Sequence, residues 1–392
     1  MKVVYVVQRY GPQAVGGAEA AVRQLAARLA GRGADVSVFT TATTNAVTWA
    51  NDLPVGESAD GTVRVVRFPT TSGRDPGFEQ LSARVLSTRD PAPELVERWV
   101  RDQGPLVPAM IDAIRARADE PDLWIFYTYL YYPTLVGLPP VAGRAVLHPA
   151  LHDEPQARLP IVRDVVRQAA GLFLQTPEEW ELVLRFAGWP PAVTTLVGLG
   201  VEAGHGDAEG FRRRLGLGSD PYLLSLGRVE DGKGTTALAR LFGAFKARHP
   251  GPLKLVIAGP VVQAPPPHDD VIVPGILGDE ERWGALAGAT VFMHPSPAES
   301  FGIALLEAWT KARPALVNAA CTVTAGHTRR SQGGLAYRDY ADFEAALELI
   351  LGDPTLAASL GAAGARYAAG YAWDSVMDRY ETFLGRVIER RP

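Results

Sequence analysis

The chain has 392 residues, which is too long for one compact core, so two domains of roughly 170 to 200 residues are expected. Its 47% hydrophobic and 21% charged content is typical of a soluble globular protein, and its net charge of −4 provides no global field that would attract nucleic acid or an anionic membrane. The single cysteine, Cys321, excludes an internal disulfide and a cysteine-rich metal site, and it fits a reducing cytosol.

The first half of the chain alternates strands with helices. KVVYVVQ (residues 2–8) is an apolar run that predicts a strand buried on both faces and not a signal peptide. Apolar residues at helical spacing follow over 16–33, and 34–41 predicts a second, parallel strand. Further strands are predicted at 62–68, 123–129, 144–150 and 171–176, with loops at 43–60 and 70–93. The uncharged stretch 123–143 is predicted to be a strand and a loop, because its prolines and tyrosines disfavour a membrane span.

The pattern restarts after a glycine-rich segment at 197–210, which is the predicted linker. Strands are predicted at 221–227, 253–259, 269–275 and 289–296, and an amphipathic helix at 236–250. We therefore predict an α/β protein with two doubly wound Rossmann-like domains that face a central cleft, with ligands beyond the carboxyl ends of the strands. The predicted domains are 1–199 and 200–372, followed by 373–392, a last helix that is expected to pack back on the N-terminal domain.

Two cations follow the strand that ends at Gly227. In LLSLGRVEDGKG, Arg228 and Lys233 lie within six residues of this strand end, and Gly232 and Gly234 flank the lysine. Glycines let the backbone approach a ligand closely, while the arginine fork and the mobile ammonium group both suit phosphate oxygens. The pattern predicts a diphosphate site, and a solvated turn with two surface charges is the alternative.

The stretch AESFGIALLEAWTKARPALV (298–317) combines the start of a helix with two glutamates. The helix is predicted to begin near Phe301 or Gly302, where unpaired N–H groups and the helix dipole attract an anion. Glu299 and Glu307 would be about 12 Å apart along a helix, which is enough to lie on either side of a bound diphosphate. Each carboxylate could then accept hydrogen bonds from the hydroxyl groups of the sugar at its end of the diphosphate. Helix capping by the first and solvent exposure of the second are the alternatives, but Glu307 lies in an apolar segment, where an unpaired buried carboxylate is costly.

These motifs resemble those of retaining glycosyltransferases of family 4, which have the GT-B fold. ESFGIALLE (299–307) looks like the Glu-x7-Glu motif of that family, and GRVEDGKG (227–234) looks like its donor-phosphate loop. GGAE (16–19) is similar to its first glycine-rich turn, and 273–296 to the segment that passes the nucleotide base. The motifs occur in the family's order along nearly the whole chain. Two departures follow the second glutamate: KARPALV lacks the frequent glycine before its proline, and 318–337 lacks the usual acidic cluster.

The resemblance implies a role for each matched residue. Glu299 would contact hydroxyls of the transferred sugar, and Arg228 and Lys233 would hold the diphosphate and stabilise its charge as the glycosidic bond breaks. The implied donor-binding residues are Glu307 at the ribose hydroxyls, the amides of Phe301 and Gly302 at the phosphates, Ile276 and Leu277 at the base, and Gly16 and Gly17 near the phosphates and the acceptor.

The segment AVLHPALHDEP (145–155) contains two candidate histidines. Related transferases place a histidine after this strand, near the transferred sugar; counting to the next strand makes His148 the candidate catalytic residue and His152 its rival. Backbone hydrogen bonding is the alternative for either. Their acidic neighbours would also suit a metal, but two prolines argue against a shared helical face, and the resemblance implies no metal and no cofactor beyond the donor.

We therefore predict a cytoplasmic retaining glycosyltransferase that moves a sugar from a nucleotide-diphosphate-sugar donor to a hydroxyl acceptor (a glycan, a lipid-linked acceptor or a small molecule). No protein nucleophile stands out, which favours a front-face displacement. No nucleic-acid partner is expected, and membrane contact is expected to be peripheral at most. A nicotinamide site is disfavoured, because GPQAVGGAE (11–19) is not G-x-G-x-x-G. A GT-B-type epimerase or phosphorylase, and a non-catalytic nucleotide-sugar-binding protein, are the alternatives.

Overall fold

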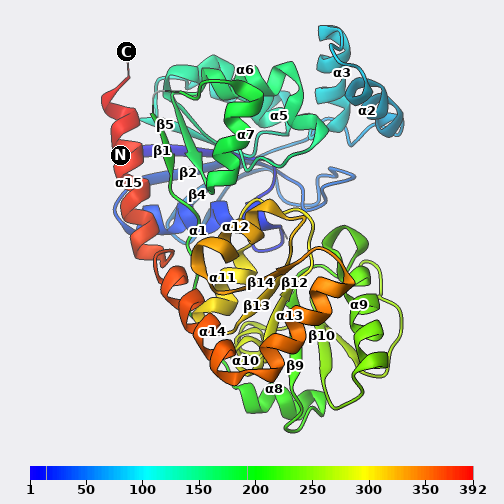
Figure 1. Cartoon of the computed structure of the whole chain (residues 1–392). Helices are drawn as coiled ribbons and strands as arrows, with labels where there is room; N and C mark the ends of the chain where they lie inside the picture. Colours follow the sequence, from blue (N-terminus) through cyan, green and yellow to red (C-terminus); the bar gives the residue numbers. More distant parts are fainter. Residues whose placement is uncertain (15, 192, 392) are drawn as a thin grey trace. The chain divides into compact units, whose positions relative to one another are not determined.

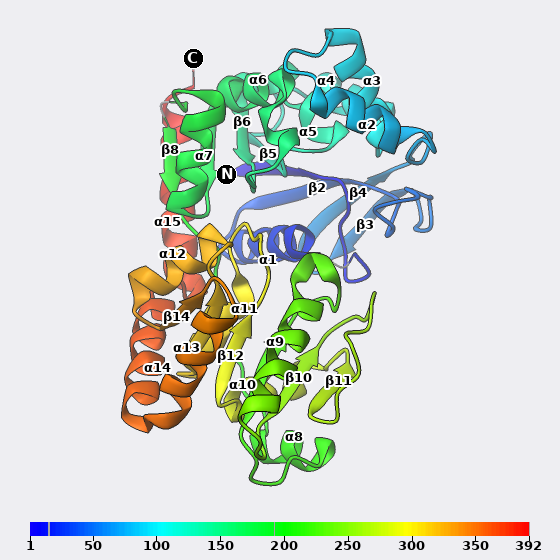
Figure 2. The ribbon, with the colours of Figure 1, turned by 45° about the vertical axis from the view of Figure 1, so that its right-hand side comes forward.

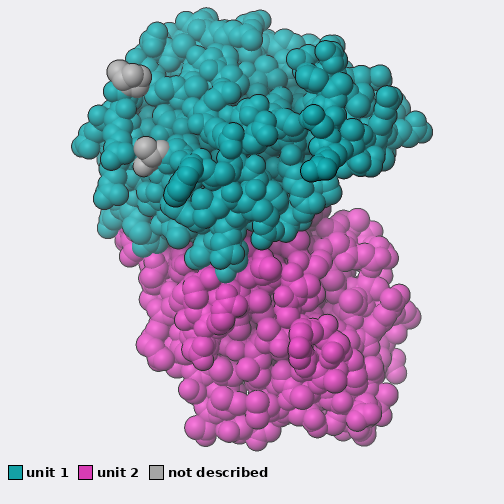
Figure 3. Space-filling view, turned by 45° about the horizontal axis from the view of Figure 1, so that its top comes forward, with its two compact units in different colours: residues 1–198, 377–392 teal, residues 199–376 magenta. Residues whose placement is uncertain are grey.

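The computed structural model of the chain describes residues 1–14, 16–191 and 193–391 (Figure 1). The chain divides into two compact units, which Figure 3 colours separately: residues 1–198 with 377–392 form unit 1, and residues 199–376 form unit 2. Each unit is a twisted sheet flanked by helices, which confirms the predicted α/β class with two Rossmann-like domains.

Unit 1 contains an eight-stranded sheet in the order β3-β4-β2-β1-β5-β6-β7-β8. All neighbouring strands are parallel except β3, which pairs antiparallel with β4 at one edge. The strands are β1 Lys2–Val7, β2 Asp35–Thr41, β3 Gly56–Asp60, β4 Val63–Phe68, β5 Leu123–Tyr127, β6 Ala145–His148, β7 Gly171–Leu174 and β8 Val193–Leu196.

The two faces of this sheet carry different helices. Val4 and Val6 on β1 face a core under the helices between β4 and β8, whereas Tyr5 points to the opposite face, where its hydroxyl lies 3.0 Å from that of Tyr380 on α15. The helical segments of unit 1 are α1 Gly17–Gly31, α2 Phe78–Ser87, α3 Pro93–Gln103, α4 Pro108–Ala116, α5 Tyr132–Gly137, α6 Pro160–Gln168, α7 Pro177–Ala187, the 3-10 turns η1 Pro139–Arg144 and η2 Pro155–Arg158, and all but the first residues of α15 Trp373–Glu389.

Unit 2 contains a six-stranded, fully parallel sheet in the order β11-β10-β9-β12-β13-β14. The chain first fills the sheet outward from β9 and then crosses to β12, so the direction of winding reverses between β9 and β12. The strands are β9 Tyr222–Leu226, β10 Lys254–Ala258, β11 Val271–Gly275, β12 Val291–His294, β13 Ala315–Asn318 and β14 Gly334–Tyr337.

Helices cover both faces of the second sheet (Figure 2). Apolar residues of α9 and α13, such as Phe242 and Leu347, share one core with the strands, while α10 and α11 pack with α8 and α14 in another layer. The helical segments are α8 Ala208–Leu215, η3 Asp231–Lys233, α9 Thr235–Arg248, α10 Asp279–Gly288, α11 Ile303–Thr310, α12 Thr322–Ser331, α13 Tyr340–Gly352 and α14 Pro354–Ala369.

Two segments expected to be loops contain regular structure. The stretch 43–60 ends in β3, and 70–93 contains α2. β3 is short, polar and largely exposed, so it lacks the apolar alternation that identifies a strand. Among the described residues, no single helix has both the length and the apolar composition to cross a membrane; α13 and α14 reach them only as a pair bent by 101°.

Candidate functional site

The winding of unit 2 reverses between β9 and β12, and the loops that follow these two strands carry most of the predicted donor residues. Ligands of such sheets bind beyond the carboxyl ends of the strands at the point of reversal. Arg228 and Lys233 follow β9, and Glu299 follows β12, so the fold brings together groups that are far apart in the sequence.

Lys233 and Glu299 form a direct ion pair, with Lys233 Nζ 2.8 Å from Glu299 Oε1. The side chains are 29% and 20% exposed, so the pair is sheltered but open to a ligand. Lys233 is the last residue of η3, and Gly234 follows it at φ 72°, where an added Cβ would lie 2.3 Å from the carbonyl oxygen of Pro295. Only glycine fits there, and this close approach holds the two loops together.

Burial opposes the ionisation of Glu299, but attraction to His294 and Lys233 outweighs it and holds the pKa of this carboxyl below its ordinary value. Burial lowers the pKa of His294, against the opposing effect of Glu299. Lys233 donates a hydrogen bond to Glu299, whose carboxylate can also accept hydrogen bonds from hydroxyl groups.

Helix α11 begins at Ile303, with Gly302 at its N-cap, in agreement with the predicted start. Gly302 has φ 82°, and an added Cβ would lie 2.9 Å from the methyl group of Thr324. Among the residues that the structure describes, no side chain caps the first N–H groups of this helix, which leaves them available to an anion. Phe301 is buried against His327 and Tyr371, so only its backbone could meet a ligand.

Glu307 is buried inside α11 and is paired with a residue that the sequence analysis did not single out. Its Oε1 accepts a hydrogen bond from Arg282 Nη1 at 2.6 Å, and Arg282 lies on α10. Burial raises the pKa of Glu307, and the nearby Arg282 opposes this rise. Glu307 is 8% exposed, which excludes the alternative in which its side chain faces solvent.

The remaining predicted donor residues are the most accessible. The Arg228 side chain is 56% exposed and lies 3.1 Å from Glu230, so its guanidinium group is not committed to the core. Ile276 is 73% exposed and Leu277 is half-buried, in the loop between β11 and α10. Its exposure leaves Ile276 free to contact a flat ring, but Trp189 and Val262 are exposed as well, so exposure alone does not distinguish it.

In unit 1, Gly16 and Gly17 begin α1 beyond the carboxyl end of β1. An added Cβ on Gly16 would lie 2.0 Å from Glu19 Oε2, whereas one on Gly17 would meet no atom within 4 Å. Glu19 itself is buried; its Oε1 lies 2.6 Å from Arg9 Nη2 and 3.1 Å from Gln8 Nε2. Glu19 belongs to the GGAE turn (16–19), in which only the two glycines have a role predicted from the sequence.

The two candidate histidines lie in different surroundings. His148 is completely buried: its ring stacks on Phe173 at 3.9 Å, and its Nε2 lies 3.2 Å from the hydroxyl of Tyr380 on α15. Burial also lowers its pKa well below the ordinary value. A direct contact between His148 and a sugar does not fit this burial, whereas His152 is half-buried and has an accessible side chain.

The loop that carries His152 is held by a buried carboxylate on α7. Glu179 Oε1 accepts the N–H of Leu151 at 2.8 Å, and Oε2 accepts the N–H of Gln175 at 2.6 Å. Burial raises the pKa of Glu179 to about 7, against the opposing effect of these backbone hydrogen bonds. Thr176 and Glu179 form the T-x-x-E pattern of a helix N-terminus. This pattern indicates where α7 begins, but it does not indicate that the Glu179 carboxylate is buried.

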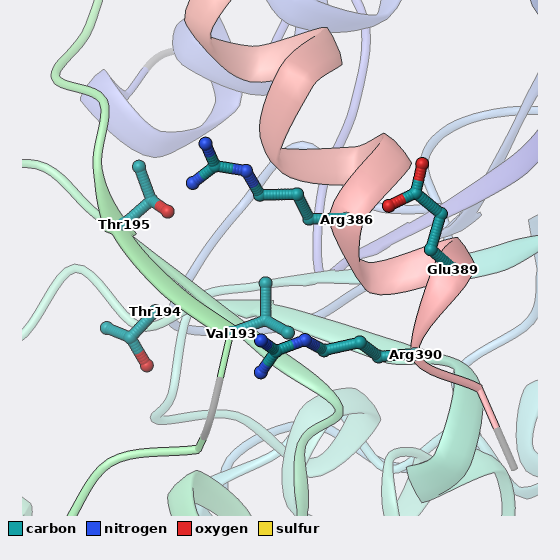
Figure 4. Close-up of a pocket in the computed structure, with 6 residues that line it drawn as sticks. All are labelled: Val193, Thr194, Thr195, Arg386, Glu389 and Arg390. Atoms are coloured by element: carbon teal, nitrogen blue, oxygen red, sulfur yellow. The ribbon is translucent and has the colours of Figure 1, made fainter.

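A hollow of about 260 Å³ in unit 1 lies between β8 and α15, and its lining contains none of the predicted site residues (Figure 4). Arg386 and Arg390 extend toward β8, while Glu389 points to the other side of the helix. In the part of the chain that the structure describes, no three His, Cys, Asp or Glu side chains are grouped so that they could hold a metal ion.

Both halves of the chain match models of glycosyltransferase domains. Residues 16–200 match the glycosyl transferase 4-like domain, and residues 207–367 match glycosyl transferases group 1. A D-inositol 3-phosphate glycosyltransferase from Stackebrandtia nassauensis is 26% identical over 417 residues, which cover 98% of this chain and 90% of the relative. One from Kribbella flavida is 30% identical over 246 residues, which cover 56% of this chain and 57% of the relative.

Solved structures share the fold over the whole chain. Sucrose-phosphate synthase from Thermosynechococcus elongatus superposes with a TM-score of 0.73 at 18% identity and covers 99% of both chains. HepE from Anabaena, solved in complex with UDP-glucose, superposes with a TM-score of 0.70 at 16% identity and covers 98% of this chain and all of its own. The two matched glycosyltransferase domain models, which follow one another along the chain, and this fold identify the chain as a glycosyltransferase with the GT-B fold.

Proposed function

We propose that the protein is a retaining glycosyltransferase whose unit 2 binds a nucleotide-diphosphate sugar and whose unit 1 binds a hydroxyl acceptor. The observation that carries the proposal is the Lys233–Glu299 pair, which lies where the winding of the unit 2 sheet reverses and directly precedes the start of α11. A cation, a free helix start and an ionised carboxylate are the groups that a diphosphate and its sugar require.

In this proposal the diphosphate accepts hydrogen bonds from the N–H groups at the start of α11 and lies near Lys233 and Arg228. An ammonium group has three N–H donors, so Lys233 can keep its bond to Glu299 and donate to a phosphate oxygen as well. As the bond between the sugar and the phosphate breaks, negative charge grows on the leaving diphosphate. Fixed cations at this place stabilise that charge more in the transition state than in the ground state.

Glu299 would hold hydroxyls of the transferred sugar and so fix the anomeric carbon relative to the diphosphate. The leaving diphosphate would then accept the proton of the acceptor hydroxyl on the same face, and the anomeric configuration would be retained. We infer no metal and no cofactor in this step, because Lys233 and Arg228 supply the positive charge. His152, with an accessible side chain, is the better candidate of the two histidines for a contact with the substrate.

Incubation of the protein with a panel of UDP-, GDP- and ADP-sugars and hydroxyl acceptors tests the proposal. We expect transfer from one donor class, a product with the donor's anomeric configuration by NMR, and loss of turnover in Glu299→Gln and Arg228→Ala. A product of inverted configuration would reject the retaining mechanism, and full turnover in both variants would reject the site. Conversion of the donor without acceptor would identify an epimerase, and dependence on inorganic phosphate a phosphorylase.

The two histidines can be separated with one further pair of variants. His152→Ala should lower kcat/KM with little change in melting temperature, because the side chain is only half-buried. His148→Ala should chiefly lower the melting temperature, because it leaves a cavity beside Phe173 and removes the bond to Tyr380. The reverse pattern would restore His148 as the residue that contacts the substrate.

A further inference from the structure

Only one oxygen of the buried Glu307 carboxylate is engaged. Oε1 accepts the 2.6 Å hydrogen bond from Arg282 Nη1, and Oε2 has no hydrogen-bond partner among the described residues. The side chain is 10% exposed, so a small accessible area remains. A carboxylate held in this way has one oxygen that fixes its orientation and a second that is open to an incoming donor group.

Arg282 is itself held from more than one side. Its guanidinium group lies 4.5 Å from the ring centre of Trp283, and its Nη2 lies 3.6 Å from Asp279 Oδ1. Trp283 is buried, and Lys311 lies 5.4 Å from the same ring. The stacking, the ion pairs and a 29% exposed side chain distinguish Arg282 from a freely rotating surface arginine.

The charge on Glu307 depends on this arginine. Burial favours the protonated form, and the neighbouring acidic groups of Glu202 and Asp279 act in the same direction; Arg282 is the group that opposes them. A protonated carboxyl would be a weaker acceptor for a pair of hydroxyls than a carboxylate. Removal of Arg282 would therefore affect both the orientation and the ionisation of Glu307.

We propose that Arg282 is a positioning residue for recognition of the nucleotide ribose, which orients the Glu307 carboxylate so that Oε2 is directed to accept hydrogen bonds from the ribose hydroxyls. The inference rests on the proposed function, in which unit 2 binds a nucleoside diphosphate. It makes Arg282, which does not itself need to touch the ligand, a determinant of the preference for ribose over deoxyribose.

The test compares nucleotide binding with and without the ribose hydroxyl. Calorimetry with UDP, GDP and ADP first identifies the diphosphate that the wild-type protein binds, and its 2′-deoxy form is then titrated. We expect the wild type to prefer the ribonucleotide by about tenfold or more, as for a hydrogen bond to a charged group. Arg282→Gln should reduce this preference to about twofold or less, and Arg282→Lys should give an intermediate value.

A pH series separates this role from a merely structural one. In Arg282→Gln, ribonucleotide affinity should begin to fall at a higher pH on acidification than in the wild type, because nothing opposes protonation of Glu307. In Glu307→Gln, addition of Arg282→Gln should not change the ratio of ribonucleotide to deoxyribonucleotide affinity any further. Arg214→Gln is the matched control. Arg214 on α8 pairs with Glu281 on α10, the helix that carries Arg282, and both side chains of this pair are exposed.

Each result has a defined meaning. The inference would be overturned if Arg282→Gln melted at the wild-type temperature and kept the wild-type pH profile and the wild-type ratio of ribonucleotide to deoxyribonucleotide affinity. The proposed function would then remain intact. If Arg282→Gln does not fold, Arg282→Lys decides by the same ratio. Failure of the wild type to bind any nucleoside diphosphate would overturn the proposed function, and the inference with it.

Discussion

Both units place a carboxylate and a cation beyond the carboxyl ends of their central strands, but the two pairs differ in exposure. In unit 1, Arg9 and Glu19 lie 2.6 Å apart with side chains 12% and 4% exposed, and Gln8 closes the contact. In unit 2, Lys233 and Glu299 lie 2.8 Å apart and are clearly more exposed. The same strand arrangement thus supports one pair that is enclosed within its unit and one that a ligand can reach.

This difference assigns different consequences to chemically similar residues. Breaking an enclosed ion pair leaves an uncompensated charge in the protein interior and lowers stability. Breaking an accessible pair costs less stability, because water can solvate the remaining partner, and the effect appears in binding or turnover instead. Variants of the two pairs test this contrast. A buried carboxylate of unit 1 and a glycine of unit 2 extend the comparison to smaller effects.

Glu19→Ala should lower the free energy of unfolding by about 3–5 kcal/mol, because Arg9 would lose its buried counter-charge. Urea denaturation measures the change. Glu57→Gln, which breaks an exposed pair with Arg64 in the same unit, is the control and should change the free energy of unfolding little. Equal losses in both variants would contradict the contrast between enclosed and exposed pairs.

Lys233→Ala should lower kcat by about 10²- to 10³-fold, as for loss of one fixed group that stabilises transition-state charge. Its melting temperature should change little, because the pair with Glu299 is accessible. Arg240→Ala is the matched control, because Arg240 is an exposed cation on α9, the helix that follows Lys233. If Lys233→Ala lost stability but kept its turnover, the Lys233–Glu299 pair would be a structural ion pair like Arg9–Glu19 in unit 1.

Glu179 makes the stability of unit 1 depend on pH. Its pKa is raised from 4.5 to about 7, so the native state binds more protons than the unfolded state between these values. Stability is therefore greatest below pH 4.5 for this group and falls by about 3 kcal/mol as the pH rises through 7. Urea midpoints at pH 5 and 7.5 measure this loss, which should be absent in Glu179→Gln. An equal slope in the variant would assign the pH dependence to other groups.

Gly302→Ala should lower stability by about 1–3 kcal/mol, because φ 82° is unfavourable for alanine and its Cβ would press on Thr324. Gly17→Ala is the comparison in unit 1, where the added Cβ meets no atom within 4 Å and little change is expected. Thermal melting measures both. A neutral Gly302→Ala would show that the start of α11 can adjust, and that its geometry is not what fixes the site.

Much of the fold could be predicted because most strands of both sheets are short apolar runs between polar turns. β1, β2, β9 and β10 lie within a residue or two of their predicted bounds. β3 and α2 were not predicted, because one is polar and the other begins after a proline- and glycine-rich loop. The start of α11 was predicted from Gly302, since a glycine before an apolar helix is a local signal.

The pairings within the site were less predictable, because they join residues from separate elements. Nothing in the sequence near Glu307 indicates that Arg282, on another helix, is its partner. The burial of His148 depends on Tyr380, which is 232 positions further along the chain. Local patterns identified residues with suitable chemistry, but the enclosure of each residue is decided by distant segments.

The return of residues 377–391 to unit 1 also affects how the protein is made. Tyr380, Phe383 and Val387 pack against the face of the first sheet that contains Tyr5 and Gly171. On the ribosome, unit 2 has all of its segments before unit 1 does, because unit 1 needs residues 377–392 as well as residues 1–198. Until residues 377–391 emerge, the apolar surface around His148 and Phe173 stays uncovered, and it is a place where the incomplete chain could aggregate.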